Sequence, residues 1–142
     1  MWLEHAQAEP RMLNYDYIAN EDVESYLRDC MADPRQAFFV AVDGETVVGT
    51  ARASIKPVDE LGMYNFDRYV YFDDLAVTPD YRRQGIAARL TDARINFAQE
   101  QGIHVCQSKV YQYNRAGRAA AESAGFEPAY TYYYKYLEAA RG

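Results

Sequence analysis

The clearest chemical signal in this sequence is a pair of arginines and a glycine at the start of an expected helix. The run Arg82-Arg83-Gln84-Gly85-Ile86-Ala87 lies between a strand-like segment and a helix-like segment. Small residues let a ligand approach the backbone, the free N–H groups of a first helical turn bind anions, and arginines add charged donors. The run is neither GxGxxG nor a P-loop. It predicts a pyrophosphate-binding loop; the alternative is a surface helix whose glycine serves packing alone.

Hydrophobic patterning supplies the elements that must position this loop. Apolar residues recur at helical spacing over 20–33, 86–101 and 114–125. Strand patterns cover 37–42, 46–55, 69–77, 103–111 and 126–137, with Asp43-Gly44 as a hairpin turn. The order predicts an α+β domain with a mixed, mostly antiparallel sheet around one right-handed βαβ unit. One such unit is too few for a doubly wound dinucleotide-binding fold.

Length and composition indicate one ordinary domain. The chain has 142 residues, of which 49% are hydrophobic and 15% aromatic, and this aromatic content excludes disorder. It has no apolar run near the ~20 residues that span a bilayer, and no secretion signal at its start. Cys30 and Cys106 form no CxxC pair. We expect a single domain over 1–142, poorly defined over 1–19, in the reducing cytoplasm.

The charge is divided unevenly along the chain. The net charge is −6, but residues 1–80 carry −10 and residues 81–142 carry +4. The acidic bulk would repel nucleic acid, whereas a small anion suits the second half and a cation the first. Chance variation of surface charge is the alternative. Fourteen tyrosines, six of them within 111–134, predict a half-wet cleft or interface, because a buried tyrosine hydroxyl needs a partner.

The segment from Leu75 to Ala87 resembles the acetyl-CoA signature of the GNAT superfamily of N-acetyltransferases. It reads LAVTPDYRRQGIA and fits the pattern L-x-V-x-P-x-x-[RQ]-x-x-G-x-[GA]. A second hallmark is similar as well, namely Asn114 followed by a helix that runs into Gly125-Phe126. The resemblance covers about residues 20–137. It implies acetyl transfer from acetyl-CoA, and a GNAT-like sheet splayed between the third and fourth strands to admit this co-substrate.

The resemblance also implies which residues hold acetyl-CoA. The pantetheine would lie along the backbone of residues 75–77, the pyrophosphate would sit on the amides of residues 83–88, and Asn114 would contact the co-substrate from the next helix. The implied cofactor-binding residues are Leu75, Ala76, Val77, Arg82, Arg83, Gln84, Gly85, Ile86, Ala87, Ala88 and Asn114.

An acidic pair, Asp73 and Asp74, directly precedes Leu75, and strand alternation places the two on opposite faces. The stretch resembles the acidic pair of polyamine-type members. One carboxylate would hold a cationic amine while the other relays its proton through water; the alternative is a solvated or ion-paired strand end. We expect direct acetyl transfer to a primary amine of a small cationic metabolite. The alternatives are acetylation of a protein N-terminus or lysine, and a non-catalytic acyl-CoA-binding module.

Two positions depart from the family pattern. Seven residues after Asn114, where many members carry the tyrosine that protonates the leaving thiolate, stands Ala121. Five residues before Asn114, where some members place a catalytic glutamate, stands Lys109. Either another group supplies the acid or the protein does not catalyse; the candidate donors are Tyr111, Tyr113 and Tyr133, and water is a further one because a thiol is already fairly acidic. We take Tyr113 as the catalytic acid.

The remaining expectations concern partners. His104 and Cys106 are interpreted as structural, so no metal site is expected. The first strand of the family has no convincing counterpart; Tyr15-Asp16-Tyr17-Ile18 is the nearest candidate. An uncovered strand edge invites pairing, and we therefore expect a homodimer. The expected ligands are acetyl-CoA and an amine, with neither nucleic acid nor membrane as a partner.

Overall fold

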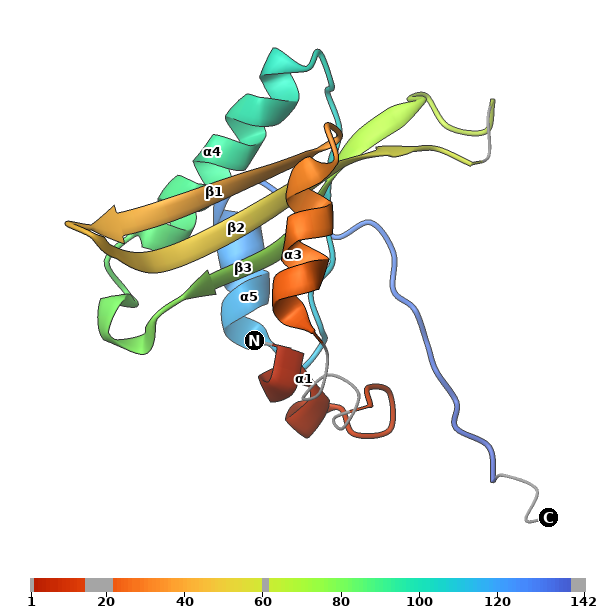
Figure 1. The fold of residues 1–142 in the computed structure, drawn as a ribbon. Coiled ribbons are helices and arrows are strands. Elements are labelled where there is room, and N and C mark those ends of the chain that lie inside the picture. Colours follow the sequence, from red (N-terminus) through yellow and green to blue (C-terminus); the bar gives the residue numbers. More distant parts are fainter. Residues whose placement is uncertain (1, 15–21, 60–61, 139–142) are drawn as a thin grey trace. The chain divides into compact units, whose positions relative to one another are not determined.

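The computed structural model describes residues 2–14, 22–59 and 62–138. The chain divides into two compact units, residues 1–22 together with 127–142, and residues 23–126. The elements of the larger unit are α3 (Val23–Ala32), β1 (Gln36–Asp43), β2 (Thr46–Pro57), β3 (Arg68–Val77), the 3-10 turn η1 (Pro79–Tyr81), α4 (Ile86–Glu100), β4 (Cys106–Ser108) and α5 (Arg115–Ser123) (Figure 1). The expected α+β class is confirmed.

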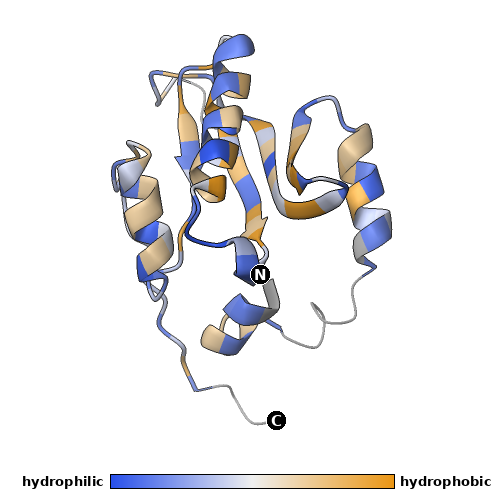
Figure 2. Cartoon of the chain, turned by 90° about the vertical axis from the view of Figure 1, so that its left-hand side faces the viewer, coloured by the Kyte–Doolittle hydropathy of each residue, from blue (hydrophilic) through white to orange (hydrophobic). Residues whose placement is uncertain are grey.

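The four strands form one sheet in the order β1-β2-β3-β4. The pairs β1/β2 and β2/β3 are antiparallel, whereas β3 and β4 are parallel and connected through α4. This is the mixed sheet with a central βαβ unit that the patterning predicts. Both hydrophobic and hydrophilic residues lie along its strands (Figure 2). None of the helices in the described ranges is long and apolar enough to cross a membrane.

Helix α4 packs on one face of the sheet and α3 on the other (Figure 1). The core lies on the α4 side, where its most buried members are Ala53, Val70, Phe72, Ala98 and Ile103. Gly49 allows this close approach, because a Cβ there would lie 3.2 Å from side-chain carbons of Ile86 and Leu90. The helix therefore fixes the sheet from behind, and the face toward α3 is left to carry polar groups.

Strands β3 and β4 diverge after a short contact. Their register runs only from Val70↔Cys106 to Phe72↔Ser108, while β3 continues to Val77 against β2 alone. The expected splay between the third and fourth strands is confirmed. Beyond Phe72, the β3 backbone has no strand partner on its β4 side within the described part of the sheet.

A β-bulge in β3 interrupts the alternation at the acidic pair. The register passes from Ala51↔Leu75 to Ala53↔Phe72, so Asp73 and Asp74 together oppose the single residue Arg52. A bulge of this kind adds one residue to one strand and redirects its side chains. The expectation that the two aspartates point to opposite faces is therefore wrong, since strict alternation holds only in an unbroken ladder.

Two expected strands differ in the structure. The fourth covers only Cys106–Ser108 instead of 103–111. The segment 126–137 contains no strand, because alternation makes a strand only where a ladder partner exists, and the described sheet offers it none. Tyr15-Asp16-Tyr17-Ile18, and the expected helix start at Asn20, lie outside the described residues.

The smaller unit contains helix α1 (Trp2–Ala8) and the tyrosine-rich segment that ends the chain. Within it, Tyr130 packs edge-on against Tyr132 at 5.3 Å between ring centroids. Tyr134 stacks on Tyr136, and the Arg11 guanidinium lies 4.5 Å from the Tyr136 ring centroid. Tyr133 is 92% exposed. The half-wet cleft or interface expected from the tyrosines stays a prediction.

Candidate active site

The arginine–glycine loop is held to the sheet by the residues that lead into it. The backbone N–H and the hydroxyl of Thr78 both donate to the Val48 carbonyl oxygen, at 2.9 and 2.8 Å. Arg82 Nε donates to the Val77 carbonyl oxygen at 3.0 Å, and the Tyr81 hydroxyl donates to Asp43 Oδ2 at 2.6 Å. These bonds fix the path of the chain from β3 into α4.

The loop backbone has the geometry of an anion cradle. Arg83 has φ 64° and Gly85 has φ 81°, and a non-glycine residue in the left-handed region marks local strain of the kind found at functional sites. Gly85 is the N-cap of α4 and makes no side-chain capping bond, so no side chain of its own competes for the amides of the first turn. A Cβ at Gly85 would meet nothing within 4 Å. Residues 83–88 thus fit a pyrophosphate, with the positive end of the α4 dipole behind it.

The other residues expected to bind the co-substrate occupy two further places. Residues 75–77 lie on the part of β3 that β4 does not cover. Asn114 is the N-cap of α5, and its side-chain oxygen accepts a hydrogen bond from the Gly117 N–H at 2.9 Å. Gln84 donates to the Asp80 carbonyl oxygen within the loop, while Ile86 points toward Gly49. The structure thus places the uncovered strand and the cradle in sequence along β3 and α4.

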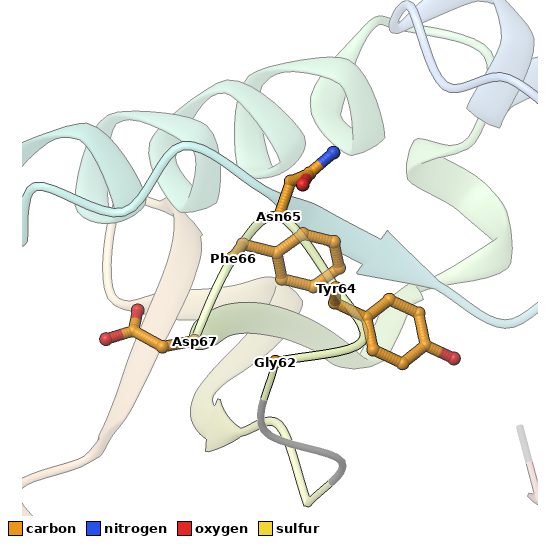
Figure 3. A pocket seen from close by; sticks show the side chains of 5 residues that line it. All are labelled: Gly62, Tyr64, Asn65, Phe66 and Asp67. Atoms are coloured by element: carbon orange, nitrogen blue, oxygen red, sulfur yellow. The ribbon is translucent and has the colours of Figure 1, made fainter.

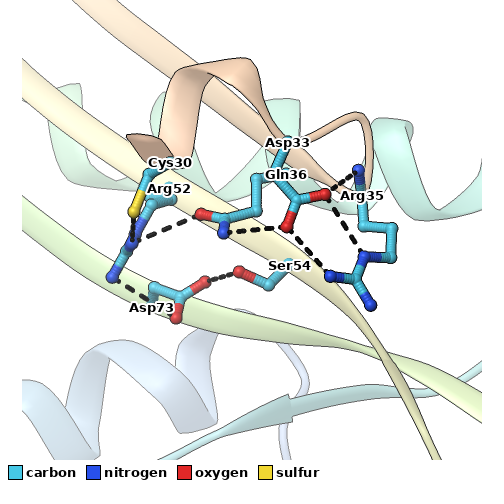
Figure 4. Close-up of polar contacts among 7 residues, drawn as sticks. All are labelled: Cys30, Asp33, Arg35, Gln36, Arg52, Ser54 and Asp73. Atoms are coloured by element: carbon cyan, nitrogen blue, oxygen red, sulfur yellow. Dashed lines mark hydrogen bonds and ion pairs between the residues drawn. The ribbon is translucent and has the colours of Figure 1, made fainter. Parts of the chain in front are cut away.

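The acidic pair is bound by an arginine from the neighbouring strand. Arg52 Nη2 lies 3.1 Å from Asp74 Oδ2 and 3.6 Å from Asp73 Oδ1, and the Ser54 hydroxyl donates to Asp73 Oδ2 (Figure 4). The side chain of Asp73 is 11% exposed and that of Asp74 28%. The two carboxylates therefore share one cation but differ in their access to solvent.

The other end of Arg52 is anchored toward α3. Nη1 donates to Cys30 Sγ at 2.9 Å and to Gln36 Oε1 at 3.3 Å (Figure 4). The Tyr26 ring centroid lies 5.3 Å from the guanidinium carbon, within the range of a cation–π contact. Arg52 is 8% exposed in total. A residue so enclosed is fixed in one place, and the carboxylates that it binds are fixed with it.

Burial and charge act in opposite directions on this cluster. Burial raises the pKa of Asp73 above its ordinary value, although the Ser54 hydrogen bond and the Arg52 charge oppose the rise. For Arg52, burial alone would lower the pKa, but the hydrogen bond with Tyr26 and the charges of Asp73 and Asp74 outweigh it and raise the pKa. Burial thus favours the neutral form of Asp73 more than in an exposed aspartate.

A second buried arginine supports the cluster from the α4 side. Arg94 is 4% exposed, its guanidinium carbon lies 4.2 Å from the Phe72 ring centroid, and Nη1 donates to the Arg52 carbonyl oxygen at 3.4 Å. Burial lowers the pKa of Arg94 to about 10, with the charges of Asp73, Cys106 and Asp74 acting against it. At neutral pH Arg94 stays charged and adds positive potential behind the acidic pair.

The structure brings in residues that the motif analysis does not name. Arg52 and Ser54 alternate with alanines in Thr50-Ala51-Arg52-Ala53-Ser54, a period of two that marks one polar face of a strand. Tyr71 lies two residues before Asp73. Burial raises its pKa, and so do the charges of Asp73, Tyr111 and Asp74. A sequence search for polar residues opposite the acidic pair would find all three only once the strand register is known.

The positions that replace the usual acid and base of the family carry no new chemistry. Tyr113 is 42% exposed and its ring stacks on Tyr111 at 6.0 Å between centroids, in the turn that leads to Asn114. Lys109 is exposed and Ala121 is half-buried. Tyr113 therefore keeps its expected role as acid only as a prediction.

A cavity of about 390 Å³ lies on the loop between β2 and β3 (Figure 3). Its lining is Gly62, Tyr64, Asn65, Phe66 and Asp67, and it includes none of the residues expected in the site. In the described part of the chain, no group of three or more His, Cys, Asp or Glu residues could hold a metal ion.

Comparison with solved structures supports the fold. A mutant of the BH1408 protein from Bacillus halodurans superposes with a TM-score of 0.84 at 18% identity, over 96% of this chain and 86% of that one. The aminoglycoside 6'-N-acetyltransferase AAC(6')-IG of Acinetobacter haemolyticus gives 0.66 at 18%, over 84% and 85%. The aminoglycoside acetyltransferase meta-AAC0020 from an uncultured soil sample, in complex with sisomicin, gives 0.68 at 21%, over 96% and 87%.

The family follows from the sequence itself. No curated protein matches the chain, but the model of the acetyltransferase (GNAT) family matches residues 2–126. That range includes the cradle, the uncovered part of β3 and the acidic pair. This protein therefore belongs to the acetyltransferase (GNAT) family, and it is an acyltransferase whose co-substrate is acetyl-CoA.

Proposed function

We propose that this enzyme transfers the acetyl group of acetyl-CoA directly to a primary amine of a small cationic metabolite. The observation that carries the proposal is the enclosed acidic pair, Asp73 and Asp74, at the point where β3 leaves β4. Together with Arg52, the pair keeps one net negative charge, which suits one ammonium group. The strongly acidic first half of the chain adds a favourable field for a cation.

The two carboxylates can divide the work of amine activation. Asp74, with 28% of its side chain exposed, is the carboxylate that an ammonium can reach. Asp73, more enclosed and with a raised pKa, accepts the amine proton through a water molecule. The neutral amine nitrogen then forms the new C–N bond as the C–S bond of acetyl-CoA breaks, and the nitrogen gives up its second proton to water as the amide forms. The departing thiolate takes a proton, for which Tyr113 is our candidate donor.

The residues that would hold acetyl-CoA are those of the cradle, the uncovered strand and the α5 N-cap. The amides of residues 83–88 would bind the pyrophosphate, residues 75–77 would bind the pantetheine, and Asn114 would offer its side-chain nitrogen. The geometry of the loop supports this assignment. Arg83 and Gly85 have positive φ, and the first-turn amides of α4 receive no side-chain capping bond from Gly85.

Aminoglycosides are one class of polycationic acceptor to include in the test. The solved structures with this fold comprise several enzymes described as aminoglycoside acetyltransferases, at 18–21% identity. Such likeness supports the fold alone, so the acceptor is left to experiment. Acetylation of a protein N-terminus or lysine is the alternative within the class.

The test is a thiol-release assay across an amine panel. Polyamines, amino acids, aminoglycosides and short peptides are each offered with acetyl-CoA, and free CoA thiol is measured against time. We expect release with small polycations. Asp74→Asn should raise the KM for the amine and leave the Kd of acetyl-CoA unchanged, while Glu24→Gln, an exposed change on α3, should alter neither. Tight acetyl-CoA binding with no turnover across the panel would instead indicate an acyl-CoA-binding module.

The proposal also includes a homodimer in the cytoplasm. Strand β1 pairs with β2 on one side only, among the strands of the described sheet, and such an edge can pair with a second copy. Light scattering of the purified protein tests the assembly: a dimer mass supports it and a monomer mass at high concentration removes it.

A further inference from the structure

We propose that Arg52 is a positioning residue of the acceptor site, whose Nη2 nitrogen holds Asp73 and Asp74 side by side and gives them different roles. The proposal rests on the amine acetyltransferase function above. Arg52 itself is too enclosed to touch an acceptor, with only 8% of its surface exposed. It acts through the two carboxylates that it binds.

The geometry makes Arg52 a direct link between the two aspartates. The β3 bulge places both residues opposite Arg52, and one nitrogen lies within 3.6 Å of an oxygen of each. Two adjacent carboxylates repel each other, and a cation between them removes that repulsion. Without Arg52, the bulge would bring like charges together on a partly buried strand.

The contacts of Nη1, the second terminal nitrogen of the guanidinium, explain why this position needs an arginine. Nη1 is bound by Cys30 Sγ and Gln36 Oε1, and Gln36 Nε2 in turn donates to Asp33 Oδ2 at 3.4 Å. The planar guanidinium can therefore bind α3 and β1 at one end and the acidic pair at the other, a span that a single ammonium group cannot cover. The network ties the position of the carboxylates to α3.

The partners of the two carboxylates set their roles. Asp73 receives the Ser54 hydroxyl as well as Arg52 and is the less exposed of the two. Asp74 keeps the larger exposed fraction. Asp73 is thus the enclosed proton acceptor and Asp74 the carboxylate at the surface of the site.

Several charged or titratable groups face the pair and must be considered in any pH measurement. From α3 these are Tyr26 and Cys30, from β2 Arg52 and Lys56, from β3 Tyr71, from α4 Arg94, and after β4 Tyr111. Of these, Arg52 is the cation with atoms closest to both carboxylates. Its removal should therefore dominate the change in the titration of Asp73.

The experiment measures the pKa of Asp73 in the ligand-free protein from the 13C resonance of its carboxyl carbon. In Arg52→Gln we expect the pKa of Asp73 to rise by about one to three pH units, the range for loss of an adjacent opposite charge. Arg52→Lys keeps a cation and should restore most of the wild-type pKa. Arg28→Gln, an exposed arginine on α3 paired with Glu24, is the matched control and should leave the titration of Asp73 unchanged.

A measurement on the wild-type protein covers the case in which Arg52→Gln does not fold. The 15N resonance of Arg52 Nη2 should shift with pH at the same midpoint as the Asp73 carboxyl carbon. Two results would overturn the proposal: an Nη2 chemical shift that does not change at the midpoint of the Asp73 titration, or an unchanged Asp73 pKa in a folded Arg52→Gln. Neither result needs turnover, so both remain informative even if the thiol-release screen finds no acceptor.

The kinetic arm tests positioning apart from charge. Where an acceptor is found, Arg52→Lys should raise its KM while the Kd of acetyl-CoA stays at the wild-type value, because one ammonium cannot hold both carboxylates in place. A KM equal to that of the wild type would show that charge alone suffices and would refute the positioning role.

Discussion

Replacement of Gly85 by alanine tests the anion cradle more directly than any charge change. Gly85 has φ 81°, and a Cβ there would meet nothing within 4 Å, so the cost of Gly85→Ala is the left-handed backbone alone, about 1–2 kcal/mol. Nothing packs against the new methyl group, and the loop can relax in the free protein. Part of the binding free energy of acetyl-CoA is then spent on returning the loop to its bound conformation. We therefore expect its Kd to rise about 5–30-fold, the factor that 1–2 kcal/mol represents.

Gly44→Ala is the matched control for this prediction. Gly44 also has a positive φ, 61°, with open space around it, but it lies in the hairpin between β1 and β2. The ladder on both sides prevents relaxation, so its cost should appear in the free energy of unfolding. Urea denaturation and calorimetric titration with acetyl-CoA measure both quantities. If Gly85→Ala binds acetyl-CoA within a factor of about two of the wild type, the loop does not bind the pyrophosphate as we describe.

Three further predictions concern capping, packing and pH. Asn114→Ala removes the acceptor of the Gly117 N–H and should cost about 1 kcal/mol in unfolding free energy, whereas Asn114→Asp keeps that acceptor and should weaken only acetyl-CoA binding; denaturation and titration separate the two roles. Phe72→Ala empties a core position 4% exposed and should cost about 3–5 kcal/mol on denaturation; a loss below about 1 kcal/mol would contradict its place in the core. The free energy of unfolding should depend on Asp33 and Asp73 with opposite signs. The pKa of Asp33 is lowered to about 2, mainly by the hydrogen bonds of Arg35, so its contribution is present above the ordinary 3.8 and lost as the pH falls. The pKa of Asp73 is raised by burial, so its contribution is present below 3.8 and lost as the pH rises. Denaturation of Asp33→Asn and Asp73→Asn across acidic pH checks both signs, and parallel slopes would refute the assignment.

The elements of the larger unit follow from local patterns in the sequence. Turn-forming residues mark the hairpin at Asp43-Gly44, and Gly85 marks the start of the following helix. The structure has both elements where these residues predict them. The final strand over 126–137 was expected from alternation alone and is absent. Alternation describes which faces a strand would show, but it does not supply the neighbour whose hydrogen bonds make the strand.

The anion cradle and the acidic pair also differ in how far the sequence alone predicts them. The cradle is contiguous in sequence, so the residue types and the strand–turn–helix context indicate it directly. The acidic pair is noticeable as two adjacent carboxylates, but its partner Arg52 lies 21 residues earlier, on another strand. Their meeting depends on the register of β2 against β3 and on the bulge at Asp73. Neither can be derived from a single sequence, because register and bulges are set by the packing of the whole sheet.

The bulge in β3 also determines which genetic changes this site can survive. A point mutation at Asp73 or Asp74 leaves the strand the same length and alters only local charge. Loss of either codon would shorten β3 by one residue and give an unbroken ladder. Leu75 would stay opposite Ala51 and Phe72 opposite Ala53, so Phe72 and Val70 would keep their places in the core, while Arg52 would face one carboxylate in place of two. We therefore expect the fold to tolerate a one-residue deletion here, and lineages that keep both carboxylates to keep the number of residues in β3 constant.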